Sequence, residues 1–383
     1  MTSVYLNQLG LLCPLGNDTE TVYRGLVVSD QWHPGHPSPL GRVDAEPPAL
    51  PASMAEYQCR NNQLLLAAFE QLRPAFQRLS RGLDRARIGV VLGTSTAGID
   101  QGEQVLRQWR AGEPAPAEYH YHQQQLGAGA DFLARHLGLD GPSLTLSTAC
   151  SSSGRALASA RALIRNDLCD LVIAGGADRL CGVTVQGFHS LGAVSDRLCN
   201  PFSVHRDGIN IGEGAALFLL SREPGPVTLS GVGASSDAHH ISGPDPQGDG
   251  AVTAMQAALD DAGAAAEQVD YLNLHGTATP QNDIMEARAI NRVFQQPPPS
   301  SATKALTGHC LGAAGALEAA FCWLLLNHPR GPLPPHRFDG DYDPDLPALD
   351  LVGDGRYPAT LRRCLSNSFA FGGNNLSLML EAG

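Results

Sequence analysis

The chain has 383 residues, of which 43% are hydrophobic and 17% are charged, and this balance excludes a disordered protein. The length predicts either two domains or one large duplicated unit. A formal net charge of −12, with no run of Lys or Arg, excludes an ordinary nucleic-acid-binding protein.

Nine cysteines are scattered along the chain without Cys-x-x-Cys spacing. Because nine is odd, we expect reduced thiols, most of them small core residues, in a cytoplasmic protein. The first ten residues lack the basic stretch and apolar core of a secretory signal. The best apolar run, residues 313–326, is broken by Glu318 and is too short for a bilayer, so no membrane span is expected.

In the first half of the chain, apolar strand-like runs alternate with helical ones, which is typical of an α/β fold. We predict strands over 88–92, 143–147 and 170–174, and a helix over 155–164. Cys150 stands between the second strand and this helix, among small residues that leave space for a substrate. A helix N-terminus favours a thiolate, so Cys150 is a candidate nucleophile, with a buried structural cysteine as the alternative.

The second half repeats this order of elements. A predicted strand over 227–231 matches one over 4–6, and a helix of small residues over 312–326 matches the helix of the first half. We therefore predict two similar α/β halves, residues 1–224 and 225–383. Proline-rich stretches predict three loops, and the end of the chain predicts a final strand: residues 31–51, 295–301 and 327–347, and residues 376–380.

Two histidines lie in Gly/Thr-rich loops next to predicted elements of the second half. His275 follows the predicted strand 270–274, and His309 precedes the small-residue helix. Ligand and catalytic groups gather at the carboxyl ends of strands, so both are candidate bases or hydrogen-bond donors. Other histidines are paired by spacing but lack a third and a fourth ligand, so no metal site is predicted at His120, His122, His239 and His240.

Lys304 is the single lysine among 26 basic residues, and it precedes His309 by five positions. A compact ammonium and a planar guanidinium are not interchangeable, so this position has a candidate role at the same site as the histidines. Chance placement of a surface lysine is the alternative. Near the end of the chain, Gly372 and Gly373 permit a close backbone approach, and Phe371 before them is suited to act as a movable lid.

Four motifs stand in the order found in elongating β-ketoacyl-acyl-carrier-protein synthases, and the resemblance covers essentially the whole chain. They are Thr148-Ala149-Cys150, the run 275–280, Lys304 with Thr307-Gly308-His309, and the run 367–373. The resemblance implies a thiolase-like, duplicated five-layer αβαβα fold and an obligate dimer. It also implies that acyl and malonyl carrier proteins are the partners and that no cofactor is needed.

The same resemblance implies a role for each site residue. Cys150 would take the acyl chain as a thioester, and malonyl-carrier protein would then bind and lose carbon dioxide. His275 and His309 would donate hydrogen bonds to the malonyl thioester oxygen as the enolate forms. The carbanion would attack the Cys150 thioester, whose oxygen would lie against the backbone N–H groups of Cys150 and Phe371.

The resemblance also implies a supporting network around the site. Lys304 would lie near His309 and hold the polar groups in register, and Glu318 matches the buried acid of the family. Asp283 and Glu286 follow the His275 motif and would support structure. None of the three acids, Glu318, Asp283 and Glu286, is expected to transfer a proton.

Two stretches indicate a narrower assignment within the family. The run 206–216 most resembles ketosynthases of accessory clusters, such as those that make aryl polyenes. The stretch 118–126 is more polar than the apolar segment of fatty-acid enzymes, which is in keeping with a polar or conjugated chain. The chain would then form a homodimer, or a heterodimer with a related ketosynthase or a chain-length-factor-like subunit.

Three other functions fit the sequence less well. A non-catalytic partner subunit usually lacks the cysteine, whereas this chain keeps Cys150, both histidines and Lys304. A degradative thiolase would not carry the synthase type of second histidine motif. A dinucleotide-binding protein would need a complete Gly-x-Gly-x-x-Gly motif, which the run 231–233 does not supply.

Overall fold

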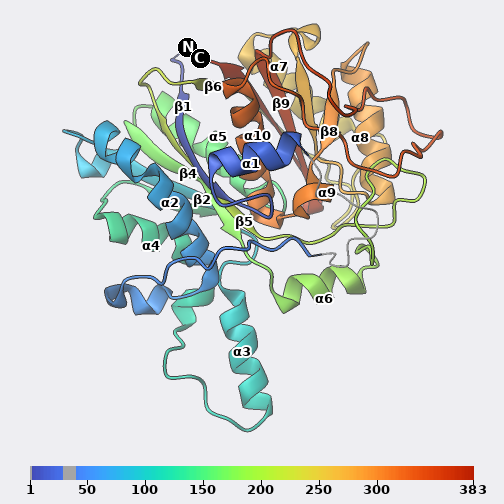
Figure 1. Ribbon diagram of the computed structural model, residues 1–383. Helices are drawn as coiled ribbons and strands as arrows, with labels where there is room; N and C mark the ends of the chain where they lie inside the picture. The colour runs from blue at the N-terminus through green and yellow to red at the C-terminus, as the bar shows by residue number, and fades with distance from the viewer. Residues whose placement is uncertain (1, 29–39) are drawn as a thin grey trace.

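The computed structural model describes residues 2–28 and 40–383. The two halves of the chain lie side by side in Figure 1, the first in blue to green and the second in yellow to red. The strands are β1 (Tyr5–Leu12), β2 (Ile88–Gly93), β3 (Ser143–Leu146), β4 (Leu171–Asp178), β5 (Gly214–Ser221), β6 (Val227–Ser236), β7 (Tyr271–Leu274), β8 (Ser300–Ala302), β9 (Arg363–Ala370) and β10 (Asn374–Ala382). The α-helices of the described residues are α1 (Thr19–Val27), α2 (Arg60–Leu79), α3 (Ile99–Arg110), α4 (Ala128–Leu137), α5 (Ser152–Arg165), α6 (Gly182–Ser190), α7 (Asp249–Ala262), α8 (Pro280–Val293), α9 (Lys304–Thr307) and α10 (Ala314–Asn327).

The ten strands form one sheet in the order β3-β2-β4-β5-β1-β6-β10-β9-β7-β8. The strands of each half, β1–β5 and β6–β10, can be numbered one to five along the chain. From the outer edge of the sheet inward, both halves then have the same order: third, second, fourth, fifth, first. In each set the three outermost strands run parallel and the remaining pairs run antiparallel. Two antiparallel residue pairs between β1 and β6 join the sets. The predicted duplication of the fold is confirmed.

The first set of strands is covered by helices on both faces. Successive side chains of a strand point to opposite faces, so the continuous apolar run of β5 enters two different cores. Leu217 and Leu219 pack with α2 and α4, whereas Phe218 and Leu220 pack with α5 and α10. A strand buried on both faces needs no polar alternation, which explains why this run reads as purely apolar.

The second set of strands is covered in the same way. Leu272, Leu365 and Met379 pack against α7 and α8, while Tyr271 and Cys364 face the layer of α5 and α10. The layers are therefore α2 and α4, the first five strands, α5 and α10, the second five strands, and α7 and α8. The predicted five-layer αβαβα fold is confirmed.

The central layer explains the apolar run of residues 313–326, which follows the His309 motif. Every side chain from Ala314 to Leu326 is buried, including Glu318. Helix α10 meets α5 at Gly315, where an added Cβ would lie 2.8 Å from the backbone nitrogen of Gly154. Within the described residues, no helix is long and apolar enough to cross a membrane.

One predicted loop is partly wrong. Residues Ser300–Ala302 form β8, which pairs in parallel with β7, although the stretch 295–301 was predicted to be irregular. Backbone pairing with a buried neighbour outweighs the weak strand preference of serine here. Residues 40–51 and 328–347 form no helix or strand apart from isolated bridges, and residues 31–39 of the first predicted loop lie outside the described residues.

Candidate active site

Cys150 lies in the turn between β3 and α5, one residue before the N-cap Ser151, and is 5% exposed. The preceding residue, Ala149, has a φ of 53°, which is strained for a residue with a Cβ. Its carbonyl accepts hydrogen bonds from the hydroxyls of Ser152 at 2.6 Å and Ser95 at 3.3 Å. These bonds hold the turn in the conformation that presents the Cys150 sulfur.

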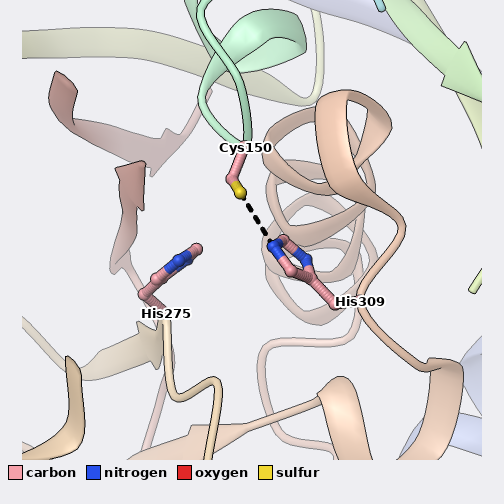
Figure 2. Close-up of side chains that lie close together, drawn as sticks. All are labelled: Cys150, His275 and His309. Atoms are coloured by element: carbon pink, nitrogen blue, oxygen red, sulfur yellow. Dashed lines mark hydrogen bonds between the residues drawn. The ribbon is translucent and has the colours of Figure 1, made fainter. Parts of the chain in front are cut away.

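Both histidine side chains face this sulfur, as Figure 2 shows. Nε2 of His309 lies 2.9 Å from Sγ of Cys150. His275 follows the end of β7, and its ring centre lies 5.5 Å from that of His309 at an interplanar angle of 85°. His275 and His309 lie 125 and 159 positions after Cys150 in the chain, and the fold brings the three side chains together.

Lys304 is 2% exposed and lies behind His275 rather than beside the sulfur. Its Nζ donates to the carbonyl oxygen of His275 and to Oε1 of Glu318, and lies 3.4 Å from Nδ1 of His275. An ammonium can only donate, so Nδ1 of His275 accepts this contact. A neutral His275 therefore carries its hydrogen on Nε2, which is free to point it into the site.

The pKa values of Cys150, His275 and His309 favour the neutral form of all three groups. Burial, followed by the charge of Lys304, holds the pKa values of His275 and His309 well below the usual range. Burial raises the pKa of Cys150 to about 12, while the charge of Lys304 and the backbone N–H of Phe371 act in the opposite direction. Burial therefore opposes the thiolate that a helix N-terminus favours.

Two buried carboxyl groups lie beneath the His275 loop. Glu286 accepts hydrogen bonds from the backbone N–H groups of His275 at 2.8 Å and Gly276 at 2.7 Å. Asp283 accepts one from the backbone of Phe202 at 2.8 Å. Burial raises the pKa of Glu286 to about 7 and that of Asp283 to about 6. Both groups therefore brace backbone and do not line the pocket.

A pocket of about 300 Å³ opens onto Cys150, His275 and His309. The ring of Phe371 lines it and lies 5.6 Å from the ring of Phe188, centre to centre. Gly372 and Gly373 follow with φ values of 79° and 72°, which only glycine adopts at little cost. The predicted Gly-Gly turn beside a bulky Phe371 is therefore present next to the sulfur.

The three facing residues have the spacing of a metal site, since their ligand atoms all lie within 4.8 Å of one another. The donor chemistry does not fit a metal, however, because Nε2 of His275 keeps its hydrogen while Nδ1 faces Lys304. In the described part of the chain, one other group has such spacing, and it is exposed: His205, Asp339 and Asp341. The histidine pairs considered from spacing alone belong to neither group.

The sequence reasoning missed Asp178, which ends β4 and is fully buried. Its carboxylate contacts the loop after β2 and the segment after His309. The signal was an acid at the carboxyl end of a strand that is otherwise apolar. Phe188 was also missed, since no pattern distinguishes it from other core aromatic residues.

Comparison with known proteins agrees with this geometry over the whole chain. Residues 36–224 match the family model of the β-ketoacyl synthase N-terminal domain, and residues 227–337 match that of the C-terminal domain. Nodulation protein E of Rhizobium meliloti is 33% identical over 409 residues, which cover 99% of this chain and 98% of that protein. The 3-oxoacyl-acyl-carrier-protein synthase 2 of Staphylococcus aureus (strain COL) is 28% identical over 416 residues, with coverage of 99% and 98%.

A solved structure is more similar still. It is the complex of a ketosynthase (ApeO) with its chain length factor (ApeC) from Xenorhabdus doucetiae, one chain of which superposes with a TM-score of 0.94 and 45% identity. The match covers 100% of this chain and 98% of that one. The ishigamide ketosynthase/chain length factor also superposes, with a TM-score of 0.88 and 28% identity over 100% of this chain and 99% of that one. The chain belongs to the β-ketoacyl synthase family of carbon–carbon bond-forming acyltransferases.

Proposed function

We propose that Cys150, His275 and His309 carry out the decarboxylative condensation of malonyl-acyl-carrier protein with an acyl chain held on Cys150. The observation that carries this proposal is the 2.9 Å contact between Nε2 of His309 and the Cys150 sulfur, with His275 facing the same point. A nucleophile and two hydrogen-bond donors on one enclosed pocket are what acyl transfer followed by enolate formation requires.

In the loading step, the Cys150 sulfur attacks the carbonyl carbon of the acyl-carrier thioester. The carrier thiol leaves and takes up the proton that Cys150 loses. Because the resting Cys150 is a thiol, this proton is handed on within the site, and Nε2 of His309 is the nearest acceptor. The acyl chain is then bound to the enzyme as a thioester.

In the second step, malonyl-carrier protein binds and its carboxylate leaves as carbon dioxide. The electron pair of the broken bond forms an enolate on the thioester oxygen. Nε2–H of His275 points into the site because Lys304 occupies Nδ1, so it donates to this oxygen. After acylation the sulfur of Cys150 has no hydrogen, so Nε2 of His309 is free to carry one and donate alongside it.

In the last step, the enolate carbon attacks the acyl carbon on Cys150. The new carbon–carbon bond forms as the bond to the sulfur breaks, so the sulfur leaves as a thiolate and a 3-oxoacyl-carrier protein is released. The thiolate takes up a proton from solvent by way of Nε2 of His309 and returns to the resting thiol. The backbone N–H of Phe371, which already contacts the sulfur, and that of Cys150 are the donors proposed for the transient oxyanion.

The test is Cys150→Ala. We expect no acyl-enzyme by mass spectrometry after incubation with acyl-carrier protein, and no condensation product. Cys169→Ala, which changes a fully buried cysteine of the core, is the matched control and should load normally. Condensation by Cys150→Ala at a normal rate would show that the nucleophile is misassigned.

We also propose an accessory role with a conjugated acyl chain and a chain-length-factor-like partner, in the cytoplasm. The similarity to the ketosynthase–chain length factor complexes supports this assembly. So does a group of exposed apolar residues on α3, on the segment 121–126 and on the edge strand β3: Leu106, Trp109, Tyr121, Leu126 and Leu144. Helix α3 extends away from the body of the protein in Figure 1.

A competition between carrier proteins tests the substrate. Acyl-carrier proteins with saturated and conjugated chains of equal length are mixed with the enzyme, and the acyl mass on Cys150 is read. A preference for the conjugated chain is expected, with and without an added chain-length-factor subunit. A preference for the saturated chain would instead favour primary fatty-acid synthesis.

We retain as a proposal the division of the chain into residues 1–224 and 225–383. The boundary lies in the turn between β5 and β6, where the strand order begins again. The two family models also meet between residues 224 and 227.

A further inference from the structure

Asp178 is a buried carboxylate that no step above uses. It is 0% exposed and ends β4. Its oxygens accept hydrogen bonds from the backbone N–H groups of Ser95 at 2.9 Å, Thr96 at 3.0 Å and Gly312 at 2.7 Å, and from the hydroxyls of Thr94 and Thr96. In the described part of the chain, Asp178 accepts hydrogen bonds from these N–H and O–H groups and from no basic side chain.

The hydrogen bonds that Asp178 accepts from the loop after β2 connect it with the turn of Cys150. The loop of Ser95 follows β2, and the Ser95 hydroxyl donates to the carbonyl of Ala149 at 3.3 Å. Ala149 is the strained residue directly before Cys150. A carboxylate that fixes Ser95 therefore also fixes the turn that presents the sulfur.

The hydrogen bond that Asp178 accepts from Gly312 connects it with the segment of His309. Gly312 lies three residues after His309, in the short turn that leads into α10. An added Cβ at Gly312 would lie 2.6 Å from the backbone nitrogen of Ser95 and 2.7 Å from the Asp178 carboxylate. Glycine is thus needed for the His309 segment to approach Asp178 this closely.

We propose that Asp178 is a positioning residue for condensation, which holds the Cys150 turn and the His309 segment against each other so that Sγ and Nε2 meet. The proposal rests on the function proposed above for Cys150 and His309. A misplacement of about 1 Å between reacting groups costs roughly a hundredfold in rate, so a single shared anchor has a large effect. The negative charge of Asp178 also disfavours the Cys150 thiolate.

The test is Asp178→Asn, in which an amide NH₂ replaces one oxygen and faces an N–H donor. We expect kcat for condensation to fall about tenfold or more, with an unchanged KM for malonyl-carrier protein. We also expect the alkylation rate of Cys150 by iodoacetamide to rise at lower pH than in the unmodified enzyme, because the nearby negative charge is gone. The second measurement would not respond to a purely structural role.

The matched control is Asp270→Asn. Asp270 also accepts two backbone N–H bonds, from Arg362 at 2.7 Å and Arg363 at 2.9 Å, but at the end of β7 away from His275. Neither kcat nor the alkylation profile should change in this variant. If Asp178→Asn does not fold, Ser95→Ala removes only the link to Ala149 and should lower kcat without changing KM.

Two results would overturn the proposal. One is an unchanged kcat in folded Asp178→Asn, whatever its alkylation profile. If Asp178→Asn is unfolded, an unchanged kcat in Ser95→Ala has the same meaning. The other is a loss of activity that merely follows the loss of folded protein, with an unshifted alkylation profile. If Cys150→Ala is inactive while Asp178→Asn is fully active, the proposed function stands and only the role of Asp178 is wrong.

Discussion

At the scale of single residues, the hydrogen bonds of Lys304 set the tautomer of His275. Lys304 contacts His275 and Glu318 in a place where 2% of the Lys304 side chain and 3% of the Glu318 side chain are exposed. An ammonium there has three hydrogens for three acceptors, which sets the tautomer of His275.

Lys304→Arg is expected to lower kcat for condensation about tenfold or more, although it keeps the charge. The planar guanidinium is larger than the ammonium and cannot reach the same three acceptors in the buried space. Steady-state kinetics with malonyl-carrier protein measure the change. Arg292→Lys, which changes an exposed ion pair with Asp249, is the control and should be fully active. A fully active Lys304→Arg enzyme would show that Lys304 is there by chance.

At the scale of helices and strands, the central layer places the site. Helices α5 and α10 carry the segments of Cys150 and His309 at their N-termini, and they touch where Gly154 meets Gly315. Small residues at this contact let the two helices approach closely. The distance between sulfur and imidazole therefore depends on the packing of two helices as well as on the loops before them.

Gly315→Ala is expected to lower the free energy of unfolding by up to about 2 kcal/mol. Alanine favours a helix over glycine by about 1 kcal/mol, but the added Cβ would lie 2.8 Å from the backbone of Gly154, and overpacking costs about 1–3 kcal/mol. Urea denaturation measures the change. Gly187→Ala in α6, where an added Cβ has no neighbour within 4 Å, is the control and should be stabilised. A stabilised Gly315→Ala protein would contradict the close contact.

At the scale of the whole molecule, the duplicated sheet places buried acids where no solvent reaches them. Glu286 is fully buried, and burial raises its pKa to about 7 from a usual 4.5. A carboxyl group with a raised pKa stabilises the folded state when it is protonated. Its contribution is complete below about pH 4.5 and is lost as the pH rises through about 7.

Glu286→Gln should therefore change stability in a way that depends on pH. As the pH rises from 5 to 8, the free energy of unfolding of the unmodified protein should fall relative to that of the variant. The reason is that Glu286 must ionise while buried, whereas glutamine does not ionise. The buried histidines titrate alike in both proteins and cancel from the difference. Urea denaturation at both pH values measures it, and a difference that does not change with pH would contradict the shift. Glu267→Gln, at an exposed position, is the control.

Most of the fold could be predicted from local patterns in the sequence. The apolar runs at 88–92, 170–174 and 270–274 are strands β2, β4 and β7, with ends shifted by one to four residues. The repeated order of elements predicted the duplication, and the resemblance supplied the five layers. Strand β8 could not be predicted, because its pairing with β7 comes from a neighbour in space and its serines carry no strand signal.

The sequence by itself determined which residues are candidates for the chemistry: Cys150, His275, His309 and Lys304 stand in recognisable motifs, each next to a predicted element. Only the tertiary structure decided their chemical states, namely the thiol form of Cys150, the neutral imidazoles and the Nε2–H tautomer of His275. It also revealed Asp178 as a hydrogen-bond acceptor shared by the loop after β2 and the segment that follows His309. The reason is physical: periodicity and turn chemistry act over a few neighbouring residues, whereas solvent exclusion and buried hydrogen bonds depend on groups brought together from distant parts of the chain.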